Sequence, residues 1–115
     1  MRDRADSQAR VESIFTTNEE GGRTTEEILD TSVAYYRNSG KVTIFSTVEY
    51  PPCGGVGWTV LFPEPKDYLM AISIVTLLRK AGTPLGVIDI LIAAMCIDRK
   101  SLLVTKDKDF KRIQG

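Results

Sequence analysis

Residues 82–112 constrain the fold of this chain more than any other segment. A Gly-Thr-Pro break opens the segment, and an almost wholly apolar helix follows, with one acid, Asp89, near its start. A polar break and a short apolar strand at 101–105 come next, and Asp107 and Asp109 stand just beyond that strand. Acids past the end of a buried strand occupy the place where open α/β sheets keep their ligand sites. The segment therefore predicts an α/β domain with a site at the end of the last strand.

The rest of the chain alternates in the same way. Residues 28–30 predict the end of a short strand, and 41–47 and 58–62, which are rich in β-branched and aromatic residues, predict two more. Residues 33–37 and 66–80 predict helices. Thr31-Ser32 can cap the first of these helices, and a helical turn is expected at 110–113. We expect a parallel sheet of about four strands with helices on both faces. Residues 26–115 form this domain, and 1–25 are a polar N-terminal extension that holds one loose helix at most.

Composition excludes several classes of protein. The content of 43% hydrophobic and 26% charged residues is that of a globular domain. The longest apolar run, 90–97, is too short to span a bilayer, and no apolar leader is visible, so the expected location is cytoplasmic. The chain has no histidine, which excludes Ser-His-Asp triads and histidine zinc sites. Any catalysis must rely on carboxylates, other polar groups or a metal.

Three acids share one topological position at the ends of strands, and a fourth can point into the same crevice. Asp30 ends the first strand, Glu49 follows the second, Asp107 follows the last, and Asp89 lies near a helix N-terminus. Each has an ordinary alternative, because Asp30 and Asp89 can cap helices, Glu49 can be surface, and Asp107 and Asp109 can be turn residues. If they converge, they repel one another unless a cation neutralises them. All-oxygen ligands select Mg²⁺ or Mn²⁺, and such a site suits phosphodiester hydrolysis.

The sequence also resembles PIN domains, the metal-dependent nuclease fold of VapC-type toxins. The resemblance covers about residues 27–114, and its most specific part is a G-x-P-x-x-x-x-D-x-L-I-A-A helix followed by L-V-T-x-D-x-D-F. A strand ending D-T-S-V and a Glu after the next strand complete the pattern. The resemblance implies that the metal-binding acids are Asp30, Glu49, Asp89 and Asp107, with Asp109 as a second candidate for the last position. Thr31 and Thr105 would supply accompanying hydroxyls.

The resemblance implies a Mg²⁺- or Mn²⁺-dependent endoribonuclease, the toxin of a toxin–antitoxin pair, which dimerises and is neutralised by a cognate antitoxin. Only 18 residues separate Asp30 from Glu49, and PIN domains usually place about twice as many there. This atypically short N-terminal half favours the alternative of a degenerate PIN domain that binds RNA or protein without cleaving. A flavodoxin-like receiver is a further alternative, but the surrounding T-K-D-K-D-F sequence favours the nuclease.

Basic residues are concentrated near the C-terminus although the formal net charge is zero. Residues 98–112 contain six basic groups against three acids. The basic groups are Arg99, Lys100, Lys106, Lys108, Lys111 and Arg112. They are either a solvated surface or an electropositive rim beside the carboxylates that can hold phosphates.

Overall fold

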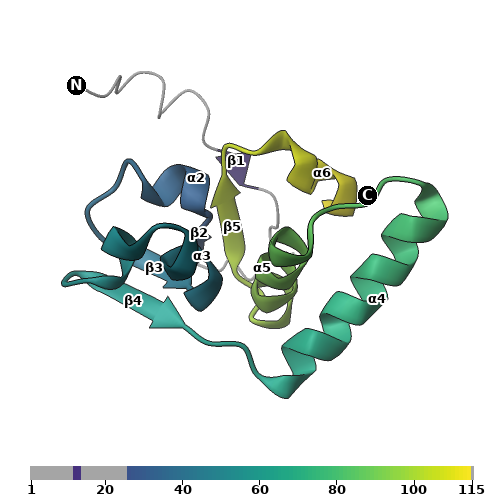
Figure 1. The fold of residues 1–115 in the computed structure, drawn as a ribbon, viewed down its shortest axis with the longest axis horizontal. Coiled ribbons are helices and arrows are strands. Elements are labelled where there is room, and N and C mark those ends of the chain that lie inside the picture. Colours follow the sequence, from purple (N-terminus) through teal and green to yellow (C-terminus); the bar gives the residue numbers. More distant parts are fainter. Residues whose placement is uncertain (1–11, 14–25, 115) are drawn as a thin grey trace.

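The computed structural model describes residues 12–13 and 26–114 (Figure 1). Two small sheets and a layer of helices make up this part of the chain. The strands are β1 (Glu12–Ser13), β2 (Glu27–Leu29), β3 (Gly40–Thr43), β4 (Trp58–Leu61) and β5 (Leu102–Thr105). The helices are α2 (Thr31–Ala34), α3 (Ile44–Glu49), α4 (Pro65–Ala81), α5 (Val87–Asp98) and α6 (Lys111–Gln114), with 3₁₀ turns η1 (Pro51–Gly54) and η2 (Lys108–Phe110).

The parallel pair β2–β5 forms the centre of the molecule. Ile28 is paired with Leu103, and Leu29 with Val104. Because side chains alternate along a strand, Ile28 and Leu103 pack on one face with α5 and Phe110. Leu29 and Val104 pack on the other face with residues of α2, β3 and η1. The predicted α/β architecture, with parallel strands and helices on both faces, is confirmed.

The four parallel strands are divided between two sheets. The first has the order β1-β5-β2, and the second is the parallel pair β3–β4, which lies beside β2. The strand predicted at 41–47 ends at Thr43, and the residues that follow form α3 instead. The reason is local: the Thr43 side chain accepts a hydrogen bond from the Ser46 N–H at 3.3 Å and so caps the helix. The β-branched residues of 41–47 predict a strand, although Thr43 caps a helix.

The first predicted helix also begins and ends differently from the expectation. Asp30, rather than Thr31 or Ser32, is the N-cap of α2, and its carboxylate accepts from the Ser32 N–H. The helix ends at Ala34, before the predicted end at Arg37. Asp30 therefore lies at the junction between β2 and α2, and the alternative in which Asp30 caps a helix is confirmed.

Helices α4 and α5 pack against each other and carry most of the helical residues of the second half of the chain (Figure 1). Pro65 and a capping box between Glu64 and Asp67 begin α4, and Gly82 ends it in the left-handed conformation. Ile74, Leu78 and Ala71 of α4 meet the α5 residues Ile90 and Ala94. No helix in the described part of the chain is long and apolar enough to cross a membrane.

The short strand β1 connects the N-terminal extension to the sheet. Glu12 and Ser13 pair antiparallel with Thr105 and Val104 of β5. The remainder of the extension, including the loose helix expected there, lies outside the described residues. The division of the chain at residue 26 stays a prediction.

Candidate metal and nucleic-acid site

Asp30 is buried at the C-terminal end of β2, with only 5% of its surface exposed. Its Oδ2 accepts hydrogen bonds from the Ser32 hydroxyl at 2.8 Å and from the Thr105 hydroxyl at 2.9 Å. Burial raises the pKa of Asp30, and the hydrogen bonds from Ser32 and Thr105 oppose that rise without cancelling it. Two separate segments, the β2–α2 junction and the end of β5, therefore hold this carboxylate in one orientation.

Glu49 reaches the same region from the last turn of α3. The Thr31 hydroxyl donates to Glu49 Oε1 at 2.6 Å, and the Ser46 hydroxyl lies 2.9 Å from Thr31 Oγ1. Thr31 directly follows Asp30, so the short N-terminal half still brings Glu49 into contact with the neighbour of the first acid. Helix α3 makes this contact possible because it lies against α2.

Asp107 stands immediately beyond β5 and begins the turn η2. Its backbone N–H donates to the Thr105 hydroxyl at 2.9 Å, and its Oδ1 accepts from the Asp109 N–H at 2.9 Å. The turn-residue interpretation is therefore correct for its backbone role. Asp109 is more exposed and forms an ion pair with Arg112 at 3.3 Å, which makes it a less suitable metal ligand than Asp107.

Asp89 lies in the first turn of α5, where the negative charges of the other acids act on it. Its pKa is raised to about 6, first by burial and then by the negative charges of Asp30, Asp107, Glu49 and Asp109, in that order. The N-cap of α5 is Gly86, and no side-chain hydrogen bond from a described residue caps this helix. The alternative in which Asp89 caps its own helix is therefore wrong.

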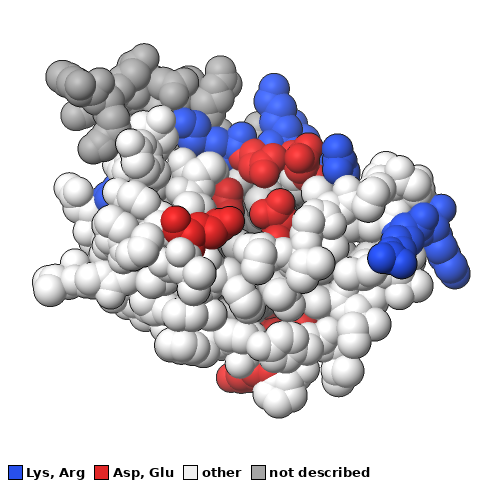
Figure 2. Space-filling model, viewed as in Figure 1, with Lys and Arg blue, Asp and Glu red and all other residues white. Residues whose placement is uncertain are grey.

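The predicted acids thus converge from four segments of the chain. In Figure 2, acidic side chains gather around a hollow where α2, α3, α5 and the β5–η2 turn meet, with Lys and Arg side chains along one edge. Mutual repulsion among these carboxylates disfavours the folded chain, and a bound cation would remove that repulsion.

The donor set fits a hard divalent cation, although its side chains are not gathered into a compact ligand group. The donors are carboxylate and hydroxyl oxygens, the ligand type of Mg²⁺ and Mn²⁺. Among the described residues, no three Asp, Glu or Cys side chains lie close enough together to form such a group. Mg²⁺ retains several waters and needs only one or two direct carboxylates, so wider spacing is compatible with binding. The role of these acids in metal binding stays a prediction.

Two hydroxyl residues of the site escaped the sequence interpretation. Ser32 bridges Asp30 to β5, because its hydroxyl also accepts from the Lys106 N–H at 3.0 Å. Ser46 is fully buried against Thr31. The position of Ser32, two residues after Asp30, is a recognisable signal for a local side-chain hydrogen bond. Ser46 has no such signal, because the β-branched residues around it predict a strand.

The basic rim is smaller than predicted. Arg99 does not belong to it, because its guanidinium forms an ion pair with the fully buried Asp67 at 3.1 Å. The same side chain donates to the carbonyls of Met95 and Phe62. Arg99 therefore joins the C-terminal end of α5 to the N-terminal end of α4. Lys106 and Lys108 follow β5 directly and remain beside the acids.

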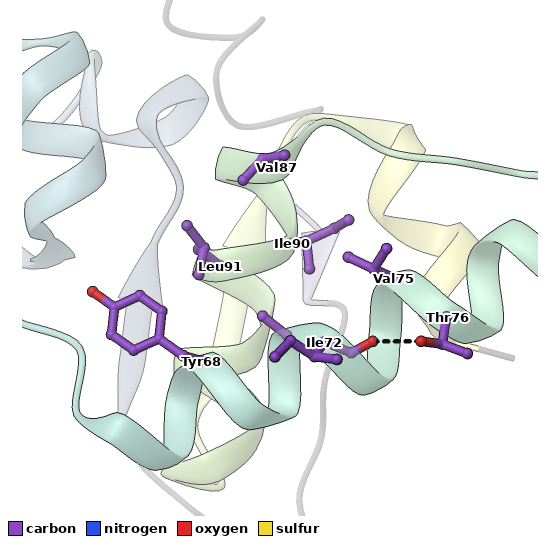
Figure 3. A pocket seen from close by; sticks show the side chains of 8 residues that line it. Tyr68, Ile72, Val75, Thr76, Val87, Ile90 and Leu91 are labelled. Carbon is purple, nitrogen blue, oxygen red and sulfur yellow. Dashed lines mark hydrogen bonds between the residues drawn. The ribbon is translucent and has the colours of Figure 1, made fainter.

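A separate apolar groove of about 370 Å³ lies between α4 and α5 (Figure 3). Its walls are almost entirely apolar, in contrast to the carboxylate cleft. The lining residues are Tyr68, Ala71, Ile72, Val75, Thr76, Val87, Ile90 and Leu91. No acid of the site lines this groove, so its apolar surface suits contact with other apolar groups and not metal binding.

An α/β fold that brings carboxylates to the C-terminal ends of parallel strands places them where such folds bind ligands. The family model of the PIN domain matches residues 64–115, a little under half of the chain. The match includes Asp89, Asp107 and Asp109, whereas Asp30 and Glu49 precede it. A comparison with curated proteins found no match.

Proposed function

We propose that this chain is a Mg²⁺- or Mn²⁺-dependent endoribonuclease, the toxin of a toxin–antitoxin pair that acts in the cytoplasm. One observation carries the proposal: the negative charges of Asp30, Asp107 and Glu49, which come from three other segments, all raise the pKa of Asp89, and acidic side chains surround one hollow in Figure 2. A bound cation would neutralise the repulsion among these carboxylates, and the chain has no histidine that could supply a positive charge instead.

The residues divide the work of such a site. Asp30, Glu49, Asp89 and Asp107 would hold the cation, with Asp109 as an alternative for the last position. Thr31, Ser32 and Thr105 orient the carboxylates through hydrogen bonds of 2.6–2.9 Å. When bound, a divalent cation supplies an activated water and a Lewis acid for the phosphodiester. Lys106 and Lys108 would position the RNA strand through its phosphates without reading its bases.

Cleavage of a labelled single-stranded RNA in Mn²⁺ tests the proposal. We expect wild-type protein to cut the RNA, and Asp30→Asn, Glu49→Gln, Asp89→Asn and Asp107→Asn to lose the activity. Asp98→Asn is the matched control, because Asp98 is an acid at the other end of the same helix. Cleavage that continues in chelator, or that survives all four substitutions, would contradict the proposal.

The second candidate is a degenerate PIN domain that binds RNA or protein without cleaving. It is favoured by the lack of a compact metal-ligand group in the described part of the chain and by the 18-residue spacing of Asp30 and Glu49. The same experiment separates the two candidates. RNA that binds with salt sensitivity and remains intact in excess Mn²⁺ would support the binding module.

The proposed toxin also needs partners. We place a homodimer contact on the α4–α5 face, where large apolar side chains are exposed beside the groove of Figure 3. These side chains are Tyr68, Leu69, Ile72, Leu77, Val87 and Ile88. A second copy of the chain would cover them and add buried area to a small domain. The antitoxin is expected to be encoded by a small open reading frame immediately upstream.

A further inference from the structure

Three tyrosines form a cluster at the end of α2. The ring centroids of Tyr35 and Tyr36 lie 5.1 Å apart with the rings at 90°, and those of Tyr35 and Tyr50 lie 5.3 Å apart at 62°. Both are edge-to-face contacts of the kind that aromatic pairs favour. Tyr35 is 49% exposed, so a large part of its ring is open to solvent although it belongs to this cluster.

The cluster adjoins the carboxylate cleft. The Tyr35 N–H donates to the Thr31 carbonyl at 3.1 Å, which places Tyr35 one helical turn beyond Thr31 on the same side of α2. The Thr31 hydroxyl contacts Glu49, and Tyr50 is the next residue after Glu49. Tyr35 is therefore linked to Glu49 through Thr31, and Tyr50 is the neighbour of Glu49 in the chain.

A cation completes the arrangement. Lys106 Nζ lies 4.1 Å from the centre of the Tyr36 ring, a cation–π contact. The backbone N–H of Lys106 donates to Ser32, and Lys106 stands between Thr105 and Asp107 in the chain. Aromatic rings and a lysine that precedes Asp107 in the chain thus lie together.

We propose that Tyr35, with Tyr36 and Tyr50 behind it, is a stacking platform for the nucleobase next to the phosphodiester bound at the carboxylates. The inference rests on the proposed ribonuclease function and adds a base-binding subsite to it. Proteins that bind single-stranded nucleic acid combine positive charge with aromatic rings on which bases stack. In a duplex both faces of each base are already stacked on neighbours, so only an unpaired base can use this platform.

Tyr35 and Tyr50 differ in how much of each ring is buried. Tyr50 packs against the core cluster of Leu29, Val33 and Val104, and this contact gives it a structural role. Tyr35 has about half of its surface in solvent and stands outside that core cluster. An exposed ring beside a site for a polyanion with aromatic bases is better suited to ligand contact than to stability.

Binding measurements on the wild-type protein, the parent, test the platform with Ca²⁺ in place of Mn²⁺, because Ca²⁺ also takes oxygen ligands and all four carboxylates stay in place. A short fluorescent single-stranded RNA is titrated in Ca²⁺ and checked on a gel to be intact, and a series of the same RNA carries one abasic site at successive positions. We expect Tyr35→Leu to weaken binding roughly five- to 150-fold, the effect of losing one base stack. We expect Tyr35→Phe to bind as the parent does. One abasic position should remove the difference in affinity between the parent and the Tyr35→Leu variant.

Tyr68→Leu is the matched control, because Tyr68 is a tyrosine of α4 with 47% exposure that lines the apolar groove. It should bind RNA as the parent does, and a duplex of the same sequence should bind the parent and the Tyr35→Leu variant equally. Equal affinities of Tyr35→Leu and parent for single-stranded RNA would overturn the platform. A Tyr35→Leu effect of the same size on every abasic RNA would also overturn it. Neither result depends on cleavage, so failure of the nuclease proposal is recognised separately.

Discussion

At the residue scale, burial and the neighbouring negative charges act in the same direction on Asp89, and both disfavour its charged form. Burial and the surrounding acids raise its pKa from 3.8 to about 6. The folded chain therefore binds a proton at this side chain more tightly than the unfolded chain does. Protonated Asp89 therefore contributes to the free energy of unfolding. This contribution is complete below pH 3.8 and is lost as the pH rises through about 6.

This sign leads to a prediction for Asp89→Asn in metal-free buffer. Above the folded pKa of about 6, the variant should melt at the same temperature as wild type or higher, because one repelling charge is gone. The difference should shrink as the pH falls toward 3.8. Thermal melts across this range measure it. A large loss of stability at every pH would show that Asp89 supports the helix structurally.

At the scale of elements, two helices end in the same turn with different residues. Gly82 ends α4 with φ of 76°, and Lys100 ends α5 with φ of 53°. In both turns the following residue donates to the carbonyl five residues back: Thr83 to Leu78, and Ser101 to Cys96. Glycine adopts this left-handed conformation without a Cβ penalty, whereas lysine does not.

We therefore predict that Lys100→Gly stabilises the protein by up to about 1 kcal/mol. Gly82→Ala should destabilise it by a similar amount, and the cause is conformational, because an added Cβ at Gly82 would meet no atom within 4 Å. Urea unfolding of the two variants provides the comparison. A Lys100→Gly protein less stable than wild type would mean that the lysine side chain has a contact worth more than the strain.

The ion pair of Arg99 and Asp67 gives a second prediction at this scale. Asp67 is fully buried and also accepts from the Glu64 N–H at 2.7 Å, so removal of its cation leaves a buried charge. Arg99→Met should cost about 3–5 kcal/mol. Arg79→Met, at an exposed position of α4, should be near neutral, and the two are compared by denaturant unfolding. Loss of RNA binding by Arg99→Met without loss of stability would restore Arg99 to the basic rim.

The same elements show what the sequence could and could not reveal. Helices α4 and α5 and strand β5 were predictable because their apolar periodicity is long and Gly82 and Pro84 interrupt it. Helix α3 was not, because Ile44, Thr47 and Val48 are β-branched and the Thr43 cap is visible only in three dimensions. The burial of Arg99 depends on a contact with Asp67, 32 residues earlier, which no local pattern indicates.

At the scale of the whole molecule, α5 serves two surfaces. Asp89 contributes to the carboxylate cleft, while Val87, Ile90 and Leu91 line the apolar groove with α4 (Figure 3). A dimer formed through the groove would therefore support the helix that carries a site residue. Dimerisation and metal binding are expected to stabilise the same element.

We predict that wild-type protein is dimeric and that Ile72→Glu makes it monomeric. Ile72 is 62% exposed on α4, so the substitution leaves the core of one copy intact. In a dimer it would place a charge in the apolar contact between the two copies. Val56→Glu, at a fully exposed apolar position outside α4 and α5, is the control and should remain dimeric. Sedimentation velocity over a range of concentrations measures the state. A wild-type protein that stays monomeric throughout would contradict the proposed interface.

The central claim is that one divalent cation binds among four carboxylates from distant parts of the chain, with one or two of them as direct ligands and water between it and the others. Calorimetric titration of Mn²⁺ into the wild type and into Asp30→Ala and Asp89→Asn tests it most directly. We predict saturable heat for the wild type, strong weakening in both variants, and a melting temperature that rises with Mn²⁺ only in the wild type. Equal, weak heats from all three proteins would contradict the claim and favour a non-catalytic binding module.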